Sequence, residues 1–155
     1  MTIASGTSNS GRICFADNTS SPQRGMIEYS HGSDAMMFNA NGSTRTTIDS
    51  SGNLTQTGNV TAYSDARLKE NVTTISDALE KVEAMRGVMF DKKSSEDDYA
   101  IVDKSSGVIA QELEKVAPEL VLDGEYKSVA YGNIVGYLIE AVKELSAKVK
   151  ELEAK

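Results

Sequence analysis

Ser64 and Lys69 are the residues whose types and spacing are best suited to chemistry, and they lie five positions apart in YSDARLKENV, residues 63–72. A serine hydroxyl is a weak nucleophile until a base removes its proton. A lysine can act as that base, but an ordinary lysine, with a pKa of about 10.4, is protonated at neutral pH. Burial disfavours the charged ammonium and lowers a lysine pKa, so such a pair is inert while exposed and competent once enclosed.

The substrate of this pair could be the chain itself, because Ser64 follows directly on the carbonyl group of Tyr63. Attack by the serine hydroxyl there gives an ester that water resolves, which cuts the bond between Tyr63 and Ser64. On a continuous α-helix, five residues turn through about 500°, so Ser64 and Lys69 would lie about 140° apart. The pair therefore requires an extended segment at Ser64 or a lysine from a neighbouring subunit. In the alternative interpretation, Ser64 or Asp65 only caps a helix in ARLKENV.

The amino-acid composition changes at Ser64, which indicates a boundary between residues 1–63 and residues 64–155. The first part contains no lysine, and its three arginines stand against four acidic residues, whereas the second carries 13 basic and 19 acidic residues. Only 39% of the 155 residues are hydrophobic and tryptophan is absent. One chain alone would bury a thin core, so oligomerisation is an option from the composition onward.

Residues 1–63 predict short β-strands between turns, because apolar side chains alternate with polar ones and Gly, Asn, Asp and Ser interrupt the pattern. The alternating positions are Ile13 and Phe15, then Ile27 and Tyr29, then Met36, Phe38 and Ala40, followed by a turn at Asn41-Gly42. This apolar face is too poor to seal a core alone. Strands of this kind are commonly completed by neighbouring chains, which also covers their edges.

Residues 64–155 predict a mixed region in which helices dominate. In ISDALEKVEAMRG, Asp77 is the expected N-cap with Glu80 at the capping-box spacing, and Gly87 fits the helix stop. The stretch VMFD predicts a strand, KKSSEDD a polar hairpin tip, and YAIV the returning strand. A short helix is expected in GVIAQELEKVAPELV, closed by Pro118.

The last helix, about residues 131–155, carries an apolar heptad seam. Val135, Val142 and Val149 occupy one core position, and Tyr131, Leu138, Leu145 and Leu152 occupy the other. The 3-4 spacing predicts a coiled coil, and the alternative is an amphipathic helix packed on its own domain. Valine with leucine nominally favours two strands, whereas Ile134, Ile139 and Ala141 widen the apolar face and suit a third strand. The seam alone therefore leaves the oligomeric state open.

Composition and motifs also argue against several partners. The net charge of −7 argues against nucleic acid, because phosphate binding requires clustered Lys and Arg. The N-terminal MTIASGTSNS lacks the regions of a signal peptide, and no apolar run approaches the roughly 20 residues that span a membrane. Cys14 is a single cysteine and His31 lies in a turn, where a lone histidine is usually solvated. We therefore expect no intrachain disulfide, no metal and no cofactor.

Three stretches in order, SDARLKENV, GVIAQELEKVAPELV and KSVAYGNIVGYLIEAVKEL, resemble the intramolecular chaperone auto-processing domain over residues 64–155. That domain ends phage tail fibres and tailspikes, including endosialidases, and has a relative in myelin regulatory factor. The resemblance implies a homotrimer that folds the fibre ahead of it and then cuts itself off. It makes Ser64 the nucleophile and first released residue, and Lys69 the base. Asp65 and Arg67 match the motif without an assigned chemical role.

Residues 1–63 resemble the end of a phage fibre shaft through GMIEYSHGSDAMMF and IDSSGNL. The expected architecture is therefore α+β: a β-rich intertwined fibre fragment, then a mixed helical chaperone domain ending in a long coiled-coil helix. The resemblance implies assembly in the host cytoplasm, a mature fibre on the virion tail and a released chaperone part. A host-surface receptor for the fibre stays open.

Two other functions remain. One is a structural or receptor-binding fibre tip that never cleaves itself, which the polar, turn-rich first half favours. The other is release of a DNA-binding factor, as in the myelin relative, and the acidic balance counts against it.

Overall fold

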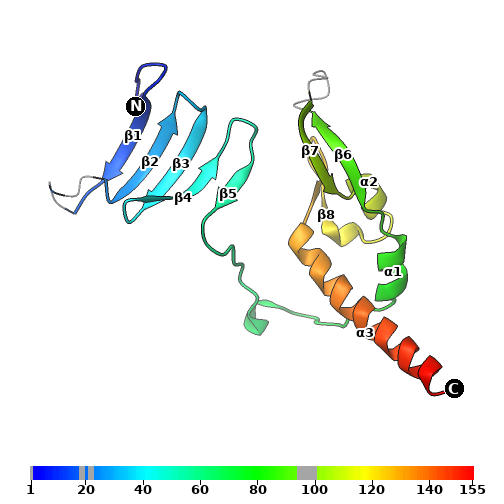
Figure 1. The fold of residues 1–155 in the computed structure, drawn as a ribbon. Helices are drawn as coiled ribbons and strands as arrows, with labels where there is room; N and C mark the ends of the chain where they lie inside the picture. Colours follow the sequence, from blue (N-terminus) through cyan, green and yellow to red (C-terminus); the bar gives the residue numbers. More distant parts are fainter. Residues whose placement is uncertain (1, 18–19, 21–22, 94–100) are drawn as a thin grey trace. The chain divides into compact units, whose positions relative to one another are not determined.

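The computed structural model describes residues 2–17, 20, 23–93 and 101–155. The chain divides into two compact units, Met1–Ser64 and Asp65–Lys155, and the division falls beside the residue at which the composition changes. Figure 1 draws the first unit as a blue to cyan sheet and the second as a mixed green to red region ending in a long helix. The fold is therefore α+β, as the sequence predicts.

In its described residues, the first unit is one antiparallel sheet in which five strands follow one another in sequence order. The strands are β1 (Ser10–Phe15), β2 (Gly25–Ser30), β3 (Ala35–Ala40), β4 (Ser43–Ile48) and β5 (Leu54–Gln56). The turn between β3 and β4 is made by Asn41 and Gly42, whose φ angles of 53° and 71° are left-handed. A two-residue hairpin of this kind needs positive φ at both positions, which asparagine and glycine tolerate. The prediction of short strands and of this turn is confirmed.

The strand register places most of the large apolar side chains of the sheet on one face, whereas Met26, Ala35 and Met37 lie on the other. Ile27 pairs with Ile13 on one side and with Phe38 on the other. Two residues along, Met36 pairs with Tyr29 and with Ile48. Ile13, Phe38 and Ile48 are about 40% exposed, and the only buried apolar residues described in this unit are Met26 and Ala35. The described part of this unit therefore leaves its apolar face uncovered.

The second unit, over residues 65–93 and 101–155, combines short helices, the long helix α3 and two pairs of antiparallel strands. Its elements are η1 (Ala66–Leu68), α1 (Ala78–Ala84), β6 (Val88–Lys93), β7 (Ile101–Gly107), α2 (Ala110–Leu113), η2 (Pro118–Leu120), β8 (Val121–Leu122), β9 (Ser128–Val129), η3 (Tyr131–Asn133) and α3 (Ile134–Glu153). β6 pairs with β7 and β8 pairs with β9, both antiparallel. The expected strand at VMFD is confirmed, whereas most of the expected hairpin tip, residues 94–98, lies outside the described residues.

The core of the second unit lies between α2, η2 and α3. Leu113, Ala117, Leu120 and Tyr137 form its buried cluster, against which Ile75 and Val82 pack from the segment around α1. The Tyr137 hydroxyl donates a hydrogen bond to Oε1 of Glu119, so the one polar atom that this tyrosine brings inside is satisfied. α1 packs against α3, as Figure 1 also shows. This packing joins the start of the unit to its last helix.

Asp77 is the N-cap residue of α1, as predicted, but its side chain does not do the capping. Asp77 takes a left-handed conformation, with φ 54°, and its side chain makes no capping hydrogen bond. Instead the carboxylate of Glu144, on α3, accepts from the backbone N–H groups of Ala78 at 2.9 Å and Leu79 at 3.0 Å. These two bonds, that from Leu79 first, hold the pKa of Glu144 below its ordinary value. The expected stop at Gly87 is wrong, because α1 ends at Ala84 and the φ angle of this glycine is not positive.

Two other helix ends differ from the sequence prediction. α2 stops at Leu113, because Lys115 and Val116 donate to carbonyl groups three residues back, in the tighter 3₁₀ pattern. Pro118 therefore does not close that helix but begins η2, a position that a proline favours because its missing N–H needs no partner there. The last helix, expected from about residue 131, begins as the 3₁₀ turn η3 and becomes α-helical at Ile134.

Candidate functional site

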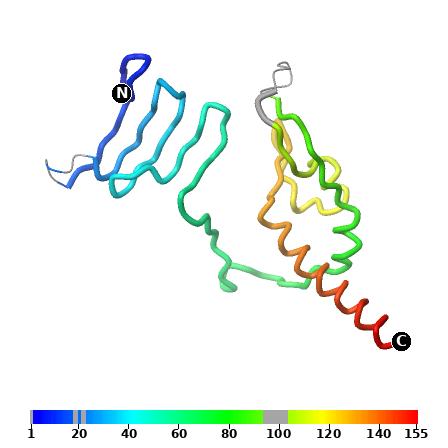
Figure 2. Tube along the Cα trace, viewed as in Figure 1, coloured from blue at the N-terminus to red at the C-terminus, as the bar shows by residue number. Residues whose placement is uncertain are grey.

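The segment that carries Ser64 and Lys69 is a single tight turn with extended arms. Only Ala66–Leu68, η1, are helical, so the alternative of a longer helix in ARLKENV is wrong. Asp65 before the turn has φ −65° and ψ 135°, and Lys69 after it has φ −128° and ψ 136°, both extended. Figure 2 follows the backbone through this segment, which is irregular apart from η1. Ser64 thus precedes the turn and Lys69 follows it, which removes the obstacle that a continuous helix posed.

Asp65 and Arg67 hold this turn through three side-chain hydrogen bonds. Asp65 Oδ1 accepts from the backbone N–H of Arg67 at 2.9 Å and from its Nε at 3.0 Å, and Oδ2 accepts from Nη2 at 2.8 Å. Asp65 is therefore the cap that the sequence proposed, for a 3₁₀ turn. The Arg67 side chain, and then its backbone N–H, lower the pKa of Asp65, and the same carboxylate raises the pKa of Arg67.

The turn is exposed in the single chain. Ser64 and Lys69 are both exposed, and the flanking apolar side chains of Tyr63, Leu68 and Val72 are more than 70% exposed. A serine–lysine pair needs an enclosed environment before the lysine can act as a base. The described residues of one chain do not supply that enclosure.

Helix α3 has two apolar faces with different roles. Tyr137 and Ala141 are buried against the helix's own unit. The seam, which we define as Val135, Leu138, Val142, Leu145, Val149 and Leu152, is 44–69% exposed along the whole helix. Packing on its own unit, one of the two alternatives of the sequence analysis, thus uses one face of α3 and leaves the seam on a separate, exposed face. That the seam forms a coiled coil remains a prediction.

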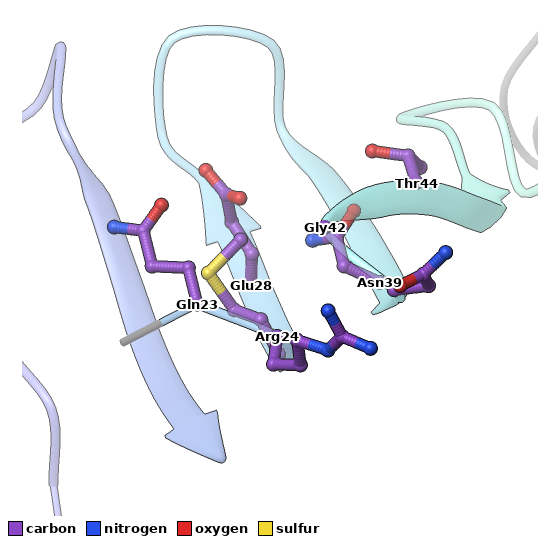
Figure 3. A pocket seen from close by; sticks show the side chains of 8 residues that line it. Gln23, Arg24, Glu28, Asn39, Gly42 and Thr44 are labelled. Atoms are coloured by element: carbon purple, nitrogen blue, oxygen red, sulfur yellow. The ribbon is translucent and has the colours of Figure 1, made fainter. Parts of the chain in front are cut away.

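A hollow of about 510 Å³ lies on the sheet of the first unit. Figure 3 shows the side chains that line it, and Arg24, Glu28, Asn39 and Thr44 are among those labelled. Glu28 is buried and accepts a hydrogen bond at 2.8 Å from Arg12, which lowers the pKa of that carboxylate. No lysine, histidine or cysteine is among the described residues that line the hollow. Its carboxylate, Glu28, is bound to Arg12 and has a lowered pKa, so it is a poor base for the Thr44 hydroxyl. We find no catalytic arrangement there.

The remaining candidates for chemistry carry none in the described part of the chain. His31 packs edge-on against the ring of Tyr29, with the ring centroids 5.0 Å apart. Residues 2–17, 20, 23–93 and 101–155 contain no group of three or more His, Cys, Asp or Glu side chains that could hold a metal ion. Over the same ranges, no helix is long and apolar enough to cross a membrane.

Comparison with known families identifies the class of the region that begins at Ser64. Residues 64–122 match the Peptidase S74 family, described as chaperone of endosialidase, and this stretch belongs to that family. The family resemblance stated from the sequence motifs is therefore confirmed over residues 64–122, and the extension of the domain to residue 155 stays a prediction. The family name describes both a chaperone and a peptidase, whereas the match itself assigns no catalytic residue.

Among curated proteins, the chain is similar to long tail fiber proteins. It is 43% identical over 103 residues to long tail fiber protein Gp37 of Enterobacteria phages K3 and T2, covering 63% of this chain and 8% of each relative. It is 36% identical over 96 residues to the protein of the same name from Enterobacteria phage M1, covering 58% of this chain and 38% of the relative. It is also 30% identical over 111 residues to myelin regulatory factor homolog 1 of Caenorhabditis elegans, covering 67% of this chain and 12% of that protein. The chain thus spans less than a tenth of the K3 and T2 proteins.

Sequence reasoning missed two contacts that shape this region. A salt bridge between residues 65 and 67 is not among the i,i+3 and i,i+4 pairs expected on a helix. The preference of Asp for N-cap positions signals the hydrogen bond from the Arg67 backbone N–H to Asp65, but not the ion pair between the two side chains. Glu144 lies 66 residues from Ala78, the residue that it caps, and no local pattern points to that pairing.

Proposed function

We propose that this chain contains the end of a phage tail fibre, in which residues 64–155 are a C-terminal intramolecular chaperone. The chaperone assembles three chains, folds the shaft formed by residues 1–63, and then releases itself by cutting between Tyr63 and Ser64. The observation that carries this proposal is the start of the Peptidase S74 match at Ser64 itself, in a chain related to long tail fiber proteins. In a peptidase that frees its own C-terminal part, the first released residue is expected at such a boundary.

The reaction is a single-turnover acyl transfer with Ser64 as nucleophile and Lys69 as base. Neutral Lys69 takes the proton from Ser64 Oγ, and Oγ attacks the carbonyl carbon of Tyr63. The Tyr63 C–N bond then breaks, the Ser64 nitrogen takes the proton from the lysine ammonium, and an ester joins Tyr63 to Oγ. Water hydrolyses the ester, which leaves a carboxylate on Tyr63 and a free hydroxyl and amino terminus on Ser64. No step needs a metal or cofactor.

Assembly is proposed as the event that starts this reaction. The exposed seam of α3 offers each chain a surface for two further helices, and the thinly covered sheet of the first unit offers another. Burial of the turn between chains would exclude water from Ser64 and Lys69 and favour a neutral lysine. In this way a chain that has not assembled stays intact, and cleavage follows folding. The partners are therefore two further copies of the chain and the upstream shaft.

The proposed course begins in the host cytoplasm and leaves the shaft on the virion tail, with the chaperone part released. We propose no nucleic-acid or membrane partner, and the receptor of the mature fibre stays open. A fibre tip that never cleaves itself is the competing function. Both functions allow a trimer, so the state of the Tyr63–Ser64 bond separates them.

The test is a denaturing gel of the purified chain combined with N-terminal sequencing of its products. Self-cleavage gives pieces of 63 and 92 residues, the larger beginning at Ser64, and a non-cleaving tip gives one band of 155 residues. Ser64→Ala should leave the chain whole because it removes the nucleophilic hydroxyl. Lys69→Arg should do the same because arginine keeps the charge but does not give up its proton. Ser146→Ala and Lys148→Arg, at exposed positions of α3, are matched controls that should be processed normally. Processing of Ser64→Ala at the same bond would remove this serine from its role.

A further inference from the structure

The pair Asp65–Arg67 has a geometry that neither the family match nor the serine–lysine chemistry explains. Both residues lie between Ser64 and Lys69, and the aspartate carboxylate binds the arginine at three points, its backbone N–H, Nε and Nη2. We call these three hydrogen bonds the clamp. The backbone adds two more across the same residues, from Leu68 N–H to the Asp65 carbonyl at 3.0 Å and from Lys69 N–H to the Ala66 carbonyl at 3.1 Å.

The clamp supports a conformation that the backbone alone would hold poorly. A 3₁₀ turn of three residues closes few hydrogen bonds for the residues that it fixes, so its formation is costly without side-chain support. The Asp65 carboxylate supplies that support by satisfying the backbone N–H of Arg67, while the forked guanidinium keeps the carboxylate in place. The extended conformations of Asp65 and Lys69 follow directly on either side of the turn. The clamp therefore fixes the path of the chain between Ser64 and Lys69.

We propose that Asp65 and Arg67 are positioning residues for self-cleavage, and this inference rests on the proposed function. Their clamp sets the backbone of the turn before assembly. After enclosure, rotation of the two side chains is then enough to bring the Lys69 amine to the Ser64 hydroxyl. Holding reacting groups in a fixed relation removes part of the entropic barrier of the reaction. Asp65 and Arg67 touch neither reacting atom in this role; they act through the turn.

The clamp also argues against Asp65 as a second base. Its carboxylate already accepts three hydrogen bonds from one arginine, and Arg67 holds the pKa of Asp65 low. A carboxylate in that state is a poor proton acceptor at neutral pH. Loss of the clamp should therefore lower the rate of cleavage without moving the pH at which the rate is half-maximal.

The experiment follows self-cleavage in cell-free synthesis, where a pulse of labelled chain is sampled over time on denaturing gels. Asp65→Ala and Arg67→Ala should each slow the single-turnover rate constant by at least tenfold. Asp65→Asn should be intermediate, because its amide oxygen can still accept from the Arg67 backbone N–H. Arg67→Lys should cleave as slowly as Arg67→Ala, because lysine cannot form the forked contact with a carboxylate. Arg86→Ala breaks a comparable exposed fork, Arg86 to Glu112, elsewhere in the unit and should cleave at the wild-type rate.

Two further measurements separate positioning from other roles. Light scattering and thermal melting of the variants in a Ser64→Ala background should show unchanged assembly and stability. If the variants that cleave slowly also lose assembly to the same degree, the clamp is structural and the inference is overturned. A shifted pH of half-maximal rate in Asp65→Ala would replace positioning with a charge effect. Wild-type rates in Asp65→Ala and Arg67→Ala, while Ser64→Ala stays uncut, would refute this inference alone. If Ser64→Ala is itself processed, the proposed function fails first.

Discussion

Leu145 and Leu113 provide a matched pair of substitutions that tests whether the seam of α3 joins chains. Both are leucines, but Leu145 in the seam is 49% exposed, whereas Leu113 in the core of the second unit is 2% exposed. Leu145→Ala should leave the fold of a single chain nearly unchanged and weaken association. Leu113→Ala should destabilise the fold itself, because it opens a cavity in packed surroundings.

The magnitude follows from the exposed fraction. Full burial of a leucine side chain contributes about 1.5–3 kcal/mol, so covering the exposed half of Leu145 contributes roughly 1 kcal/mol per chain. In a trimer the substitution acts three times, about 3 kcal/mol in total, which lowers the association constant about 100-fold. The concentration of half-assembly depends on the square root of that constant, so it should rise about tenfold. Leu113→Ala should cost about 2–5 kcal/mol of folding free energy.

The assay is a dilution series followed by light scattering and sedimentation, on intact chains that carry Ser64→Ala. Circular dichroism melts of the same samples report the stability of the fold. We expect Leu145→Ala to shift assembly with little change in the melt at concentrations where the chain is dissociated, and Leu113→Ala to lower that melt. An unchanged concentration of half-assembly for Leu145→Ala would refute the reasoning, because a half-exposed leucine in a true interface cannot be removed without effect.

Three further outcomes follow from the structure and the proposed function. Leu145→Asp should weaken both assembly and self-cleavage, because an unpaired carboxylate in the seam is costly to bury; a monomeric variant that still cuts itself would show that enclosure by assembly is unnecessary. The lowered pKa of Glu144 means that its caps on Leu79 and Ala78 contribute stability above the ordinary glutamate pKa and lose it as the pH falls through the lower folded value. Glu144→Gln should therefore flatten the acid limb of a melting-temperature profile, and an identical limb would contradict the cap. After melting and cooling, uncut Ser64→Ala chains should recover trimers while the processed shaft, freed of its chaperone, recovers few. Equal recovery by light scattering would show that the shaft trimerises unaided.

The sequence by itself determined the features that repeat at a fixed spacing. Alternation at Ile27, Tyr29, Met36 and Phe38 predicted strands, because successive side chains of a strand point to opposite faces whatever surrounds them. The heptad spacing predicted the long helix for a similar reason, because the number of residues per turn is fixed by the geometry of the helical backbone. The order of three motifs identified the chaperone of endosialidase class, and the turn residues Asn41-Gly42 located a hairpin through their tolerance of positive φ.

Tertiary structure decided where helices end and which surfaces are covered. The Glu144 carboxylate, and not the side chain of the N-cap residue Asp77, caps α1 because packing brings α3 beside α1. An acceptor that is distant in sequence leaves no mark in the sequence around the helix start. The two faces of α3 contain similar apolar residues, and only the packing of the second unit buries Tyr137 while leaving Leu145 exposed. Periodicity specifies the path of a local backbone, whereas capping partners and burial depend on segments that meet only after the chain has folded.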